Sequence, residues 1–358
     1  MIGNRWRSVI VVAVVWSWTQ PSQAADAPHP IDPWWMLLHE LAVPDDLALT
    51  PAQRSAWHEA LVPLDRKFFV LRSKPSREVA AGMDEILPAA RAAVGKILTP
   101  SQSARLDQLL ARMLGTRALL RPDFADKLKL TDQQRTDVKQ AIDESQAAID
   151  AARAAKDQTA DQIAKQVAKL QTEHNARLQK IFRLDQQRQW RDHVASDFDV
   201  TRFGHPAFQA PELIGTPTAW HNGQSLSLSK LRGKVVVIHF FAFGCINCVH
   251  NYPVYRQWQT ELAGKEVALI GIHTPETAAE KNIDNLVRKL KEDDLQFPVL
   301  ADTDLANWQA WGNTMWPTVY VLDKQGRLRY FWPGELRWEG ATGDKIARGW
   351  IDELLAEK

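Results

Sequence analysis

Apolar and polar positions follow two different patterns along the chain. From residue 26 to about residue 202, glycine is sparse and apolar residues recur three and four positions apart, as one buried face of a helix requires. After that point proline and glycine become more frequent and short β-branched runs appear. The pattern therefore predicts an all-α helical domain over 26–202, followed by an α/β domain over 203–358. Clear helical stripes cover residues 106–114, 138–149 and 163–182.

A short motif, Leu-Thr-x-x-Gln, recurs in the helical region at 49–53, 98–102 and 130–134. Each copy is a candidate capping box, in which the Thr hydroxyl accepts from the amide of the Gln while the Gln side chain reaches back to the Thr amide. The copies are unequally spaced, so a regular solenoid is not predicted. The segment Ala147–Lys169, rich in Ala, Gln, Lys and Asp, is predicted to form one long solvated helix.

The second half alternates between strand and helix signals. Val235–Phe243 and Val267–Ile272 are apolar runs without alternation, which is typical of parallel strands buried on both faces. An amphipathic segment between them completes a βαβ unit, with Cys245 and Cys248 at the start of its helix. Further elements are expected as a helix at 277–293, a short strand at 297–300, a hairpin at 318–322 and 328–332, and a last helix at 343–355.

Composition narrows the class of protein. A chain of 358 residues predicts about two domains. The net charge of +1 gives no indication of a nucleic-acid partner. With 45% hydrophobic and 24% charged residues, the chain is neither a polytopic membrane protein nor mainly disordered. Two cysteines exclude a multi-bridge disulfide scaffold and a four-cysteine zinc site.

Residues 1–25 have the three parts of a secretory signal peptide: basic residues, a short apolar run at Val9–Trp16, and small residues that end at Ala25. The apolar run is shorter than the ~20 residues that a spanning helix needs. An uncleaved membrane anchor is the alternative, and it would be the chain's only contact with a membrane. Export predicts a periplasmic or secreted protein in an oxidising compartment.

The pair Cys245-Ile-Asn-Cys248 has a chemical reason for its position. The thiolate is the nucleophile in disulfide exchange, and the positive end of a helix favours the thiolate. Cys245 is therefore predicted to attack a substrate disulfide. Cys248, about one helical turn further on, is predicted to resolve the mixed disulfide.

The second half resembles the thioredoxin fold over residues 205–340. It is most similar to the TlpA-like redoxins, which are related to the AhpC/TSA proteins, and within them to the DipZ-like branch. The residues that carry the resemblance are Leu-Arg-Gly-Lys-Val-Val-Val at 231–237, Cys-Ile-Asn-Cys at 245–248, Pro253, Gly-Ile-His-Thr-Pro-Glu at 271–276 and Trp-Pro-Thr at 316–318.

The resemblance implies further site residues. Pro317 stands where the family has a cis-proline, and with Trp316 it would bind an extended substrate. His239 occupies the place of a buried acid that transfers protons to the resolving cysteine, although a satisfied core histidine is an equal interpretation. Glu276 is a second candidate for the proton relay, with structural capping as its alternative. No cofactor and no metal are expected.

The predicted function is that of an exported thiol–disulfide oxidoreductase that reduces protein disulfides, with electrons from a membrane transporter of the DsbD or CcdA type. The Leu-Thr-x-x-Gln motifs resemble those of Spy- and CpxP-type periplasmic proteins, which are chaperones or sensors; a helical spacer or docking domain is the alternative. One alternative function is therefore that of a client-binding protein whose redoxin half serves only as a docking unit. Two others are a thiol peroxidase with antioxidant activity and a copper-handling redoxin of the SCO type. Haem attachment is not expected, because Val249 rather than His follows Cys248.

Overall fold

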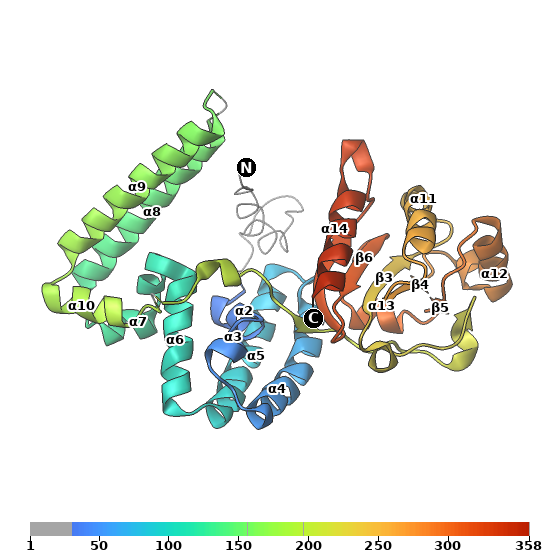
Figure 1. Ribbon diagram of the computed structural model, residues 1–358, viewed down its shortest axis with the longest axis horizontal. Coiled ribbons are helices and arrows are strands. Elements are labelled where there is room, and N and C mark those ends of the chain that lie inside the picture. Colours follow the sequence, from blue (N-terminus) through green and yellow to red (C-terminus); the bar gives the residue numbers. More distant parts are fainter. Residues whose placement is uncertain (1–30, 156, 196, 358) are drawn as a thin grey trace.

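The computed structural model describes residues 31–155, 157–195 and 197–357. The predicted signal peptide at 1–25 lies outside these residues. The first half of the described chain is helical and the second half is built around a mixed sheet (Figure 1). The helices of the first half are α2 (Pro33–Leu38), α3 (Val43–Asp46), α4 (Pro51–Leu71), α5 (Ser76–Ile97), α6 (Pro100–Leu114), α7 (Pro122–Lys127), α8 (Asp132–Ala154), α9 (Ala160–Ile181) and α10 (Leu184–Asp192).

The sheet contains seven strands in the order β1-β7-β6-β3-β4-β5-β2. Strands β3, β4 and β5 are parallel, and the remaining pairings are antiparallel. The strands are β1 (Phe208–Gln209), β2 (Trp220–His221), β3 (Val235–Phe241), β4 (Val267–His273), β5 (Val299–Ala301), β6 (Thr318–Leu322) and β7 (Arg327–Pro333). The helices of this half are α11 (Ile246–Glu261), α12 (Ile283–Glu292), α13 (Ala306–Ala310) and α14 (Gly343–Ala356). The expected α/β architecture of the C-terminal half is confirmed.

Every residue of β3 is buried, as its unbroken apolar run predicts. Val235, Val237 and Phe241 face a cluster built with α11, α12 and α14. Val236 and Phe240 face the opposite cluster, which includes Trp311 at the end of α13. The central strand therefore has an apolar layer on each side.

The second of these layers contains helices from the first half of the chain. Trp35 of α2 and Phe68 of α4 are almost fully buried in the same cluster as Phe240 and Tyr320 of the sheet. The Phe68 ring stacks on Phe208 of β1 with a centroid separation of 5.3 Å. The helical region and the redoxin-like region thus share one hydrophobic core.

Buried polar groups strengthen this junction. Asp65 of α4 is 2.7 Å from His39 Nε2 and accepts from the Gln209 amide of β1 at 2.9 Å. Glu40 accepts from the amides of Gly204 and His205, where the chain enters the second half. These bonds satisfy carboxylates that would be costly to bury alone.

The helical region contains two copies of one arrangement. We call α3 to α6 (residues 43–114) the first helical unit and α7 to α10 (residues 122–192) the second. Each unit has a short helix, a turn residue with positive φ (Ala48 or Lys129), a long helical hairpin, and a further capped helix. The two starting motifs are 81 positions apart, at Thr50 and Thr131.

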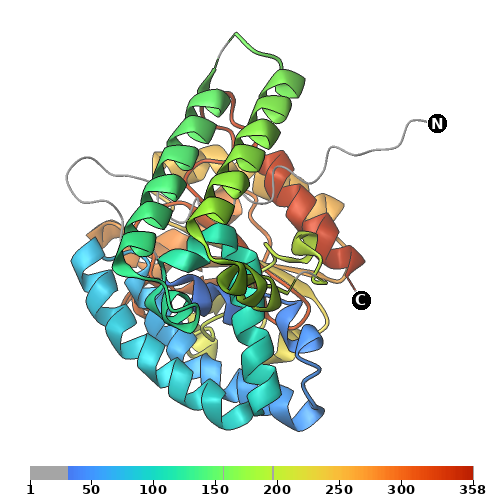
Figure 2. The same ribbon diagram turned by 90° about the vertical axis from the view of Figure 1, so that its left-hand side faces the viewer.

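The prediction of one long helix over 147–169 is wrong. The chain turns between the end of α8 at Ala154 and the start of α9 at Ala160. Thr159 caps α9, and Gln162 completes a capping box there. The reversal lets α8 and α9 pack against each other, and the resulting hairpin projects from one end of the molecule (Figures 1 and 2).

The predicted capping boxes form, and their glutamines also have a second role. Gln53 and Gln102 donate to each other's side-chain oxygens at 2.8 and 3.2 Å while each also binds its own helix start. In the second unit Gln134 pairs with Gln186 in the same way. Each pair, which we call a glutamine pair, joins the start of the long hairpin to the start of the following helix.

Candidate redox site

The two cysteines lie where β3 gives way to α11. Cys245 is the N-cap residue of α11 and is partly exposed, whereas Cys248 lies in the first turn and is fully buried. The amides of Cys248 and Val249 donate to the Cys245 carbonyl at 3.0 and 3.1 Å, so the first helical turn fixes both side chains.

The environments of the two thiols move their pKa values in opposite directions. The pKa of Cys245 is lowered to about 7, first because the Cys248 thiol donates a hydrogen bond to its sulfur, and then because the amides of Cys248 and Asn247 point towards it. Burial raises the pKa of Cys248. At neutral pH the exposed sulfur is therefore the available thiolate and the buried one holds the proton.

The residues predicted to bind substrate lie beside this helix start. The Trp316–Pro317 peptide bond is cis, immediately before β6. Trp316 packs at the edge of the same cluster as Cys245, stacks on Trp308 at 4.0 Å, and donates from Nε1 to the Thr274 carbonyl at 3.1 Å. Around them are three exposed apolar side chains, those of Ile246, Val249 and Met315.

A carboxylate not foreseen from the sequence holds the loop before Cys245. Glu280 is buried and accepts from the Gly244 amide at 2.7 Å and from the amides of Glu276 and Thr277 at 2.9 and 2.7 Å. The pattern Thr277-x-x-Glu280 is itself a capping box, which could have pointed to Glu280. Its bond to Gly244 joins two loops that are distant in sequence.

The two relay candidates occupy different surroundings. Glu276 is exposed, and its negative charge raises the pKa of both Cys245 and Cys248. His239 is fully buried among aromatic rings, with Tyr255 at 4.2 Å and Phe297 at 4.7 Å.

Burial lowers the pKa of His239 to about 3, so its imidazole is neutral at physiological pH.

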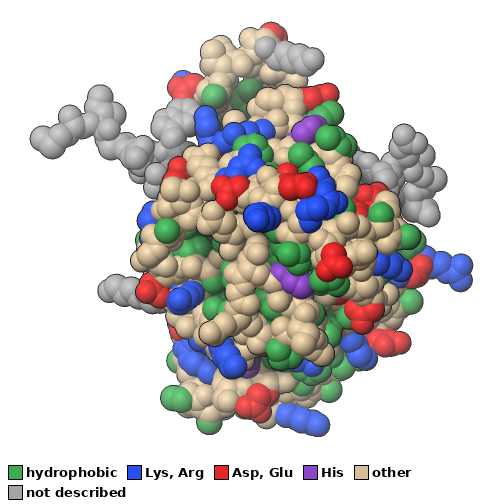
Figure 3. Space-filling view, turned by 90° about the vertical axis from the view of Figure 1, so that its right-hand side faces the viewer, with side chains coloured by type: hydrophobic (Ala, Val, Ile, Leu, Met, Phe, Trp, Pro, Cys, Tyr) green, Lys and Arg blue, Asp and Glu red, His purple; other side chains and the backbone are tan. Residues whose placement is uncertain are grey.

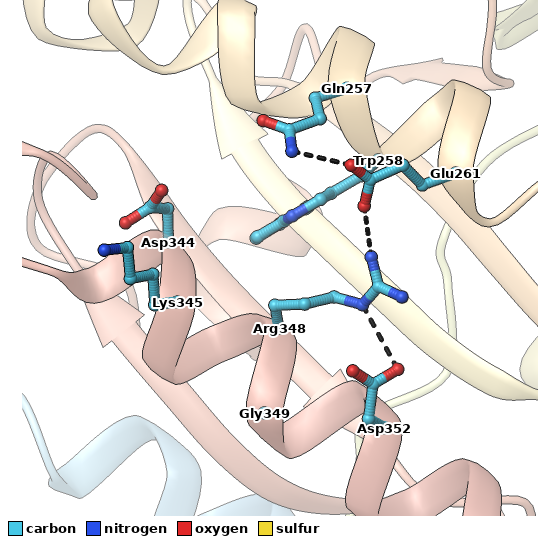
Figure 4. Close-up of a pocket in the computed structure, with 8 residues that line it drawn as sticks. All are labelled: Gln257, Trp258, Glu261, Asp344, Lys345, Arg348, Gly349 and Asp352. Atoms are coloured by element: carbon cyan, nitrogen blue, oxygen red, sulfur yellow. Dashed lines mark hydrogen bonds and ion pairs between the residues drawn. The ribbon is translucent and has the colours of Figure 1, made fainter.

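The hollow between α11 and α14 is separate from this site. It has a volume of about 290 Å³ and is lined by charged groups, in which Arg348 bridges Glu261 and Asp352 (Figure 4). None of the predicted site residues lines it.

Three further observations come from the surface and side chains of the described residues. On the face drawn in Figure 3, acidic and basic side chains are interspersed. Among the described residues, no three His, Cys, Asp or Glu side chains are grouped to hold a metal ion. In the same part of the chain, no helix combines the length and apolar character needed to cross a membrane.

A dithiol at the start of the helix that follows the central strand, beside a cis-proline loop on a mixed sheet, defines the thioredoxin-fold redoxins. A family model for the AhpC/TSA family matches residues 205–331. The second half of the chain thus has the thioredoxin fold, and residues 205–331 of it match a redoxin family model.

Individual proteins match part of the chain. Protein DipZ of Mycobacterium tuberculosis is 36% identical over 129 residues, which are 35% of this chain and 18% of DipZ. Thiol-disulfide oxidoreductase YkuV of Bacillus subtilis is 27% identical over 147 residues, 41% of this chain and 94% of YkuV. A solved structure of a thiol-disulfide isomerase from Corynebacterium glutamicum is 26% identical, covers 42% of this chain and 98% of its own, and has a TM-score of 0.36. The chain thus spans less than a fifth of DipZ.

Proposed function

We propose that this protein is a thiol–disulfide oxidoreductase that reduces protein disulfides through Cys245 and Cys248. The observation that carries the proposal is the opposite shift of the two thiol pKa values, with that of Cys245 lowered to about 7 and that of Cys248 raised. The similarity of this chain to YkuV, which is named as a thiol-disulfide oxidoreductase, supports the same activity.

The proposed reaction has two exchanges. The Cys245 thiolate attacks one sulfur of the substrate disulfide, which breaks that bond and releases the other sulfur as a thiolate. Cys248 then loses its proton and attacks the Cys245 sulfur, which forms the intramolecular disulfide and releases the second substrate thiol. The substrate gains two electrons and the chain loses two, so an external dithiol must reduce the chain again; we propose a membrane donor of the DsbD or CcdA type.

The buried Cys248 needs a proton acceptor before it can attack. Of the two predicted relay residues, we propose Glu276 for this step, because its carboxylate is exposed to solvent and its charge acts on the pKa of both thiols. The neutral His239 ring is enclosed by aromatic side chains, which favours a packing role there. Export to the periplasm or beyond is also part of the proposal, and it rests on the signal-like pattern of residues 1–25.

The first test is replacement of the nucleophile. We expect Cys245→Ser to abolish dithiothreitol-dependent reduction of insulin, because the serine hydroxyl is not ionised at neutral pH, while the unfolding midpoint stays close to that of the wild type. Cys248→Ser should instead accumulate a mixed disulfide with the substrate. An active Cys245→Ser variant would remove the nucleophile assignment.

The pH dependence provides a sharper test. Alkylation of reduced protein by iodoacetamide should rise with pH through a midpoint near 7, because only the Cys245 thiolate reacts. Cys248→Ala removes the hydrogen bond that contributes most to the lowered pKa, so the midpoint should move upward. Cys248→Ser keeps a hydroxyl donor and is the matched control. Equal midpoints in the two variants would contradict the proposed role of the Cys248 thiol.

A further inference from the structure

The loop that carries Trp316 and Pro317 is held from the side of the helical region. Arg72 follows the last residue of α4 and donates from its guanidinium to the Trp311 carbonyl at 2.6 Å. It also donates to the Tyr320 hydroxyl. We call residues 311–317 the cis-proline loop. A residue of the first helical unit thus contacts both the start of this loop and the strand that follows it.

The contact is continued inside the redoxin domain. The Tyr320 hydroxyl donates to Asn313 Oδ1 at 2.7 Å, and both residues are buried. The Arg72 guanidinium also lies 5.0 Å from the centroid of the Tyr320 ring and 5.2 Å from that of Phe69. Since an arginine can donate in several directions and stack on aromatic faces at once, lysine does not replace it here.

The backbones of the loop and of α4 also touch. Gly312 has a φ of 59°, and a Cβ at this position would lie 2.1 Å from the Phe69 carbonyl oxygen. Only a glycine allows this approach. The loop therefore rests directly on the end of α4 and is fixed there by Arg72.

The far end of the same loop faces the redox site. Met315 is exposed beside Trp316, which is held by its bond to the Thr274 carbonyl. A protein disulfide that pairs with this edge must find the loop in one position, whereas a small disulfide needs only access to Cys245.

We propose that Arg72 is a positioning residue through which the helical region sets the recognition of protein disulfides. It contributes no reacting atom and acts by holding the cis-proline loop. This inference rests on the proposed function, and it deepens it by giving the helical region a part in substrate selection.

The experiment compares two substrates in the full-length protein. Arg72→Met keeps apolar bulk but loses both donors. We expect it to lower kcat/KM for reduction of insulin by about tenfold, while the second-order rate with 5,5′-dithiobis(2-nitrobenzoate) and the pH midpoint of Cys245 alkylation stay unchanged. Tyr320→Phe, which loses only the hydroxyl, should shift the ratio of the two rates in the same direction by a smaller factor.

A matched arginine provides the control. Arg105 bonds to Asp46 and Asp197 within the helical region, so Arg105→Met removes a comparable set of contacts away from the redoxin domain. It should leave the ratio of insulin to small-disulfide rates at the wild-type value. An unchanged ratio in Arg72→Met overturns the inference, whether neither rate falls or both rates fall by the same factor.

Two further outcomes have defined meanings. If Arg72→Met does not fold, Tyr320→Phe decides, because it keeps the aromatic packing; an unchanged ratio in that variant overturns the inference. If the wild-type protein reduces neither disulfide, the proposed function itself fails, and this outcome is distinguishable from failure of the inference alone.

Discussion

In the first helical unit, Phe68 and Phe69 at the end of α4, and Arg72 just after it, face the redoxin sheet, and the two rings are almost fully buried. In the second unit, the positions 81 residues further on are Ile149, Asp150 and Arg153 of α8. Ile149 is half-buried, and the two charged residues are exposed. The same local pattern therefore leads to a docked unit in one case and to a projecting hairpin in the other (Figure 2).

The comparison distinguishes the interactions that stabilise each unit internally from those that dock it onto the sheet. Capping boxes and a glutamine pair are present in both units and close each one locally. The second unit also has its own small core, which includes Val138, Ile142 and Leu178. Docking onto the sheet depends on large apolar residues at the end of α4, and the second unit does not have them. A repeated motif thus predicts that the local fold is repeated, but it does not predict what each copy packs against.

The largest difference between the two units should appear in the free energy of unfolding, when one apolar side chain is truncated at the matching position of each unit. Phe68→Ala should lower the free energy of unfolding by about 3–5 kcal/mol, because a ring packed on both Phe208 and Trp35 is lost. Ile149→Ala is the matched control and should cost about 1 kcal/mol or less at its half-buried position. Urea unfolding followed by far-UV circular dichroism measures both values.

In Phe68→Ala, the urea concentration at which half of the insulin-reducing activity is lost should fall together with the unfolding midpoint, because the two regions share one core. An activity midpoint that stays at the wild-type urea concentration would contradict a shared core.

Substitutions in the glutamine pairs should instead lower the free energy of unfolding by similar amounts in both units. Gln53→Ala and Gln134→Ala each remove donors to a carbonyl and to the partner glutamine, so each should lower the free energy of unfolding by about 1–2 kcal/mol. Gln133→Ala is the control, because Gln133 is exposed and bonds only to Asp137 one turn away. A large cost at one pair and none at the other would show that the two units are not equivalent.

The smallest effect is expected from shortening the projecting hairpin. Replacing residues 147–169 by a short Gly-Ser connection should leave insulin reduction within about twofold of the wild-type rate, because this part stands away from the redoxin domain (Figure 1). Steady-state insulin reduction at pH 7 provides the measurement. A tenfold loss would assign the hairpin a direct part in catalysis or substrate binding.

The elements that the sequence predicted best are those whose cause is local. β3, β4 and β6 follow from unbroken apolar runs, and the observed bounds of β6 agree with the expected 318–322. β1 and β2 were missed because strands of two residues carry no periodicity. α13 was missed as well, since its five residues begin after Leu305 in a left-handed conformation that tertiary packing maintains.

Long-range relations were hidden for a different reason. The start of α10, at Arg183 to Gln186, lacks the threonine of the motif, so the second glutamine pair could not be recognised from the three matching copies. In the site, Cys245 could be named from the CxxC motif and its place before a helix, and Pro317 from the resemblance to the family. The roles of Glu280 and Arg72 could not, because their partners belong to loops far away in sequence.

The shared core also affects how the chain is made. Phe68 leaves the ribosome 252 residues before Tyr320, a strand residue of the cluster in which it is buried. At about 5–20 residues per second, that interval is roughly 12–50 s. During this time the docking face of α4 has no sheet to cover it, so the nascent first unit exposes apolar rings that the finished protein hides. During synthesis there is therefore a period in which the exposed docking face of α4 offers a binding site to a chaperone that recognises apolar surface.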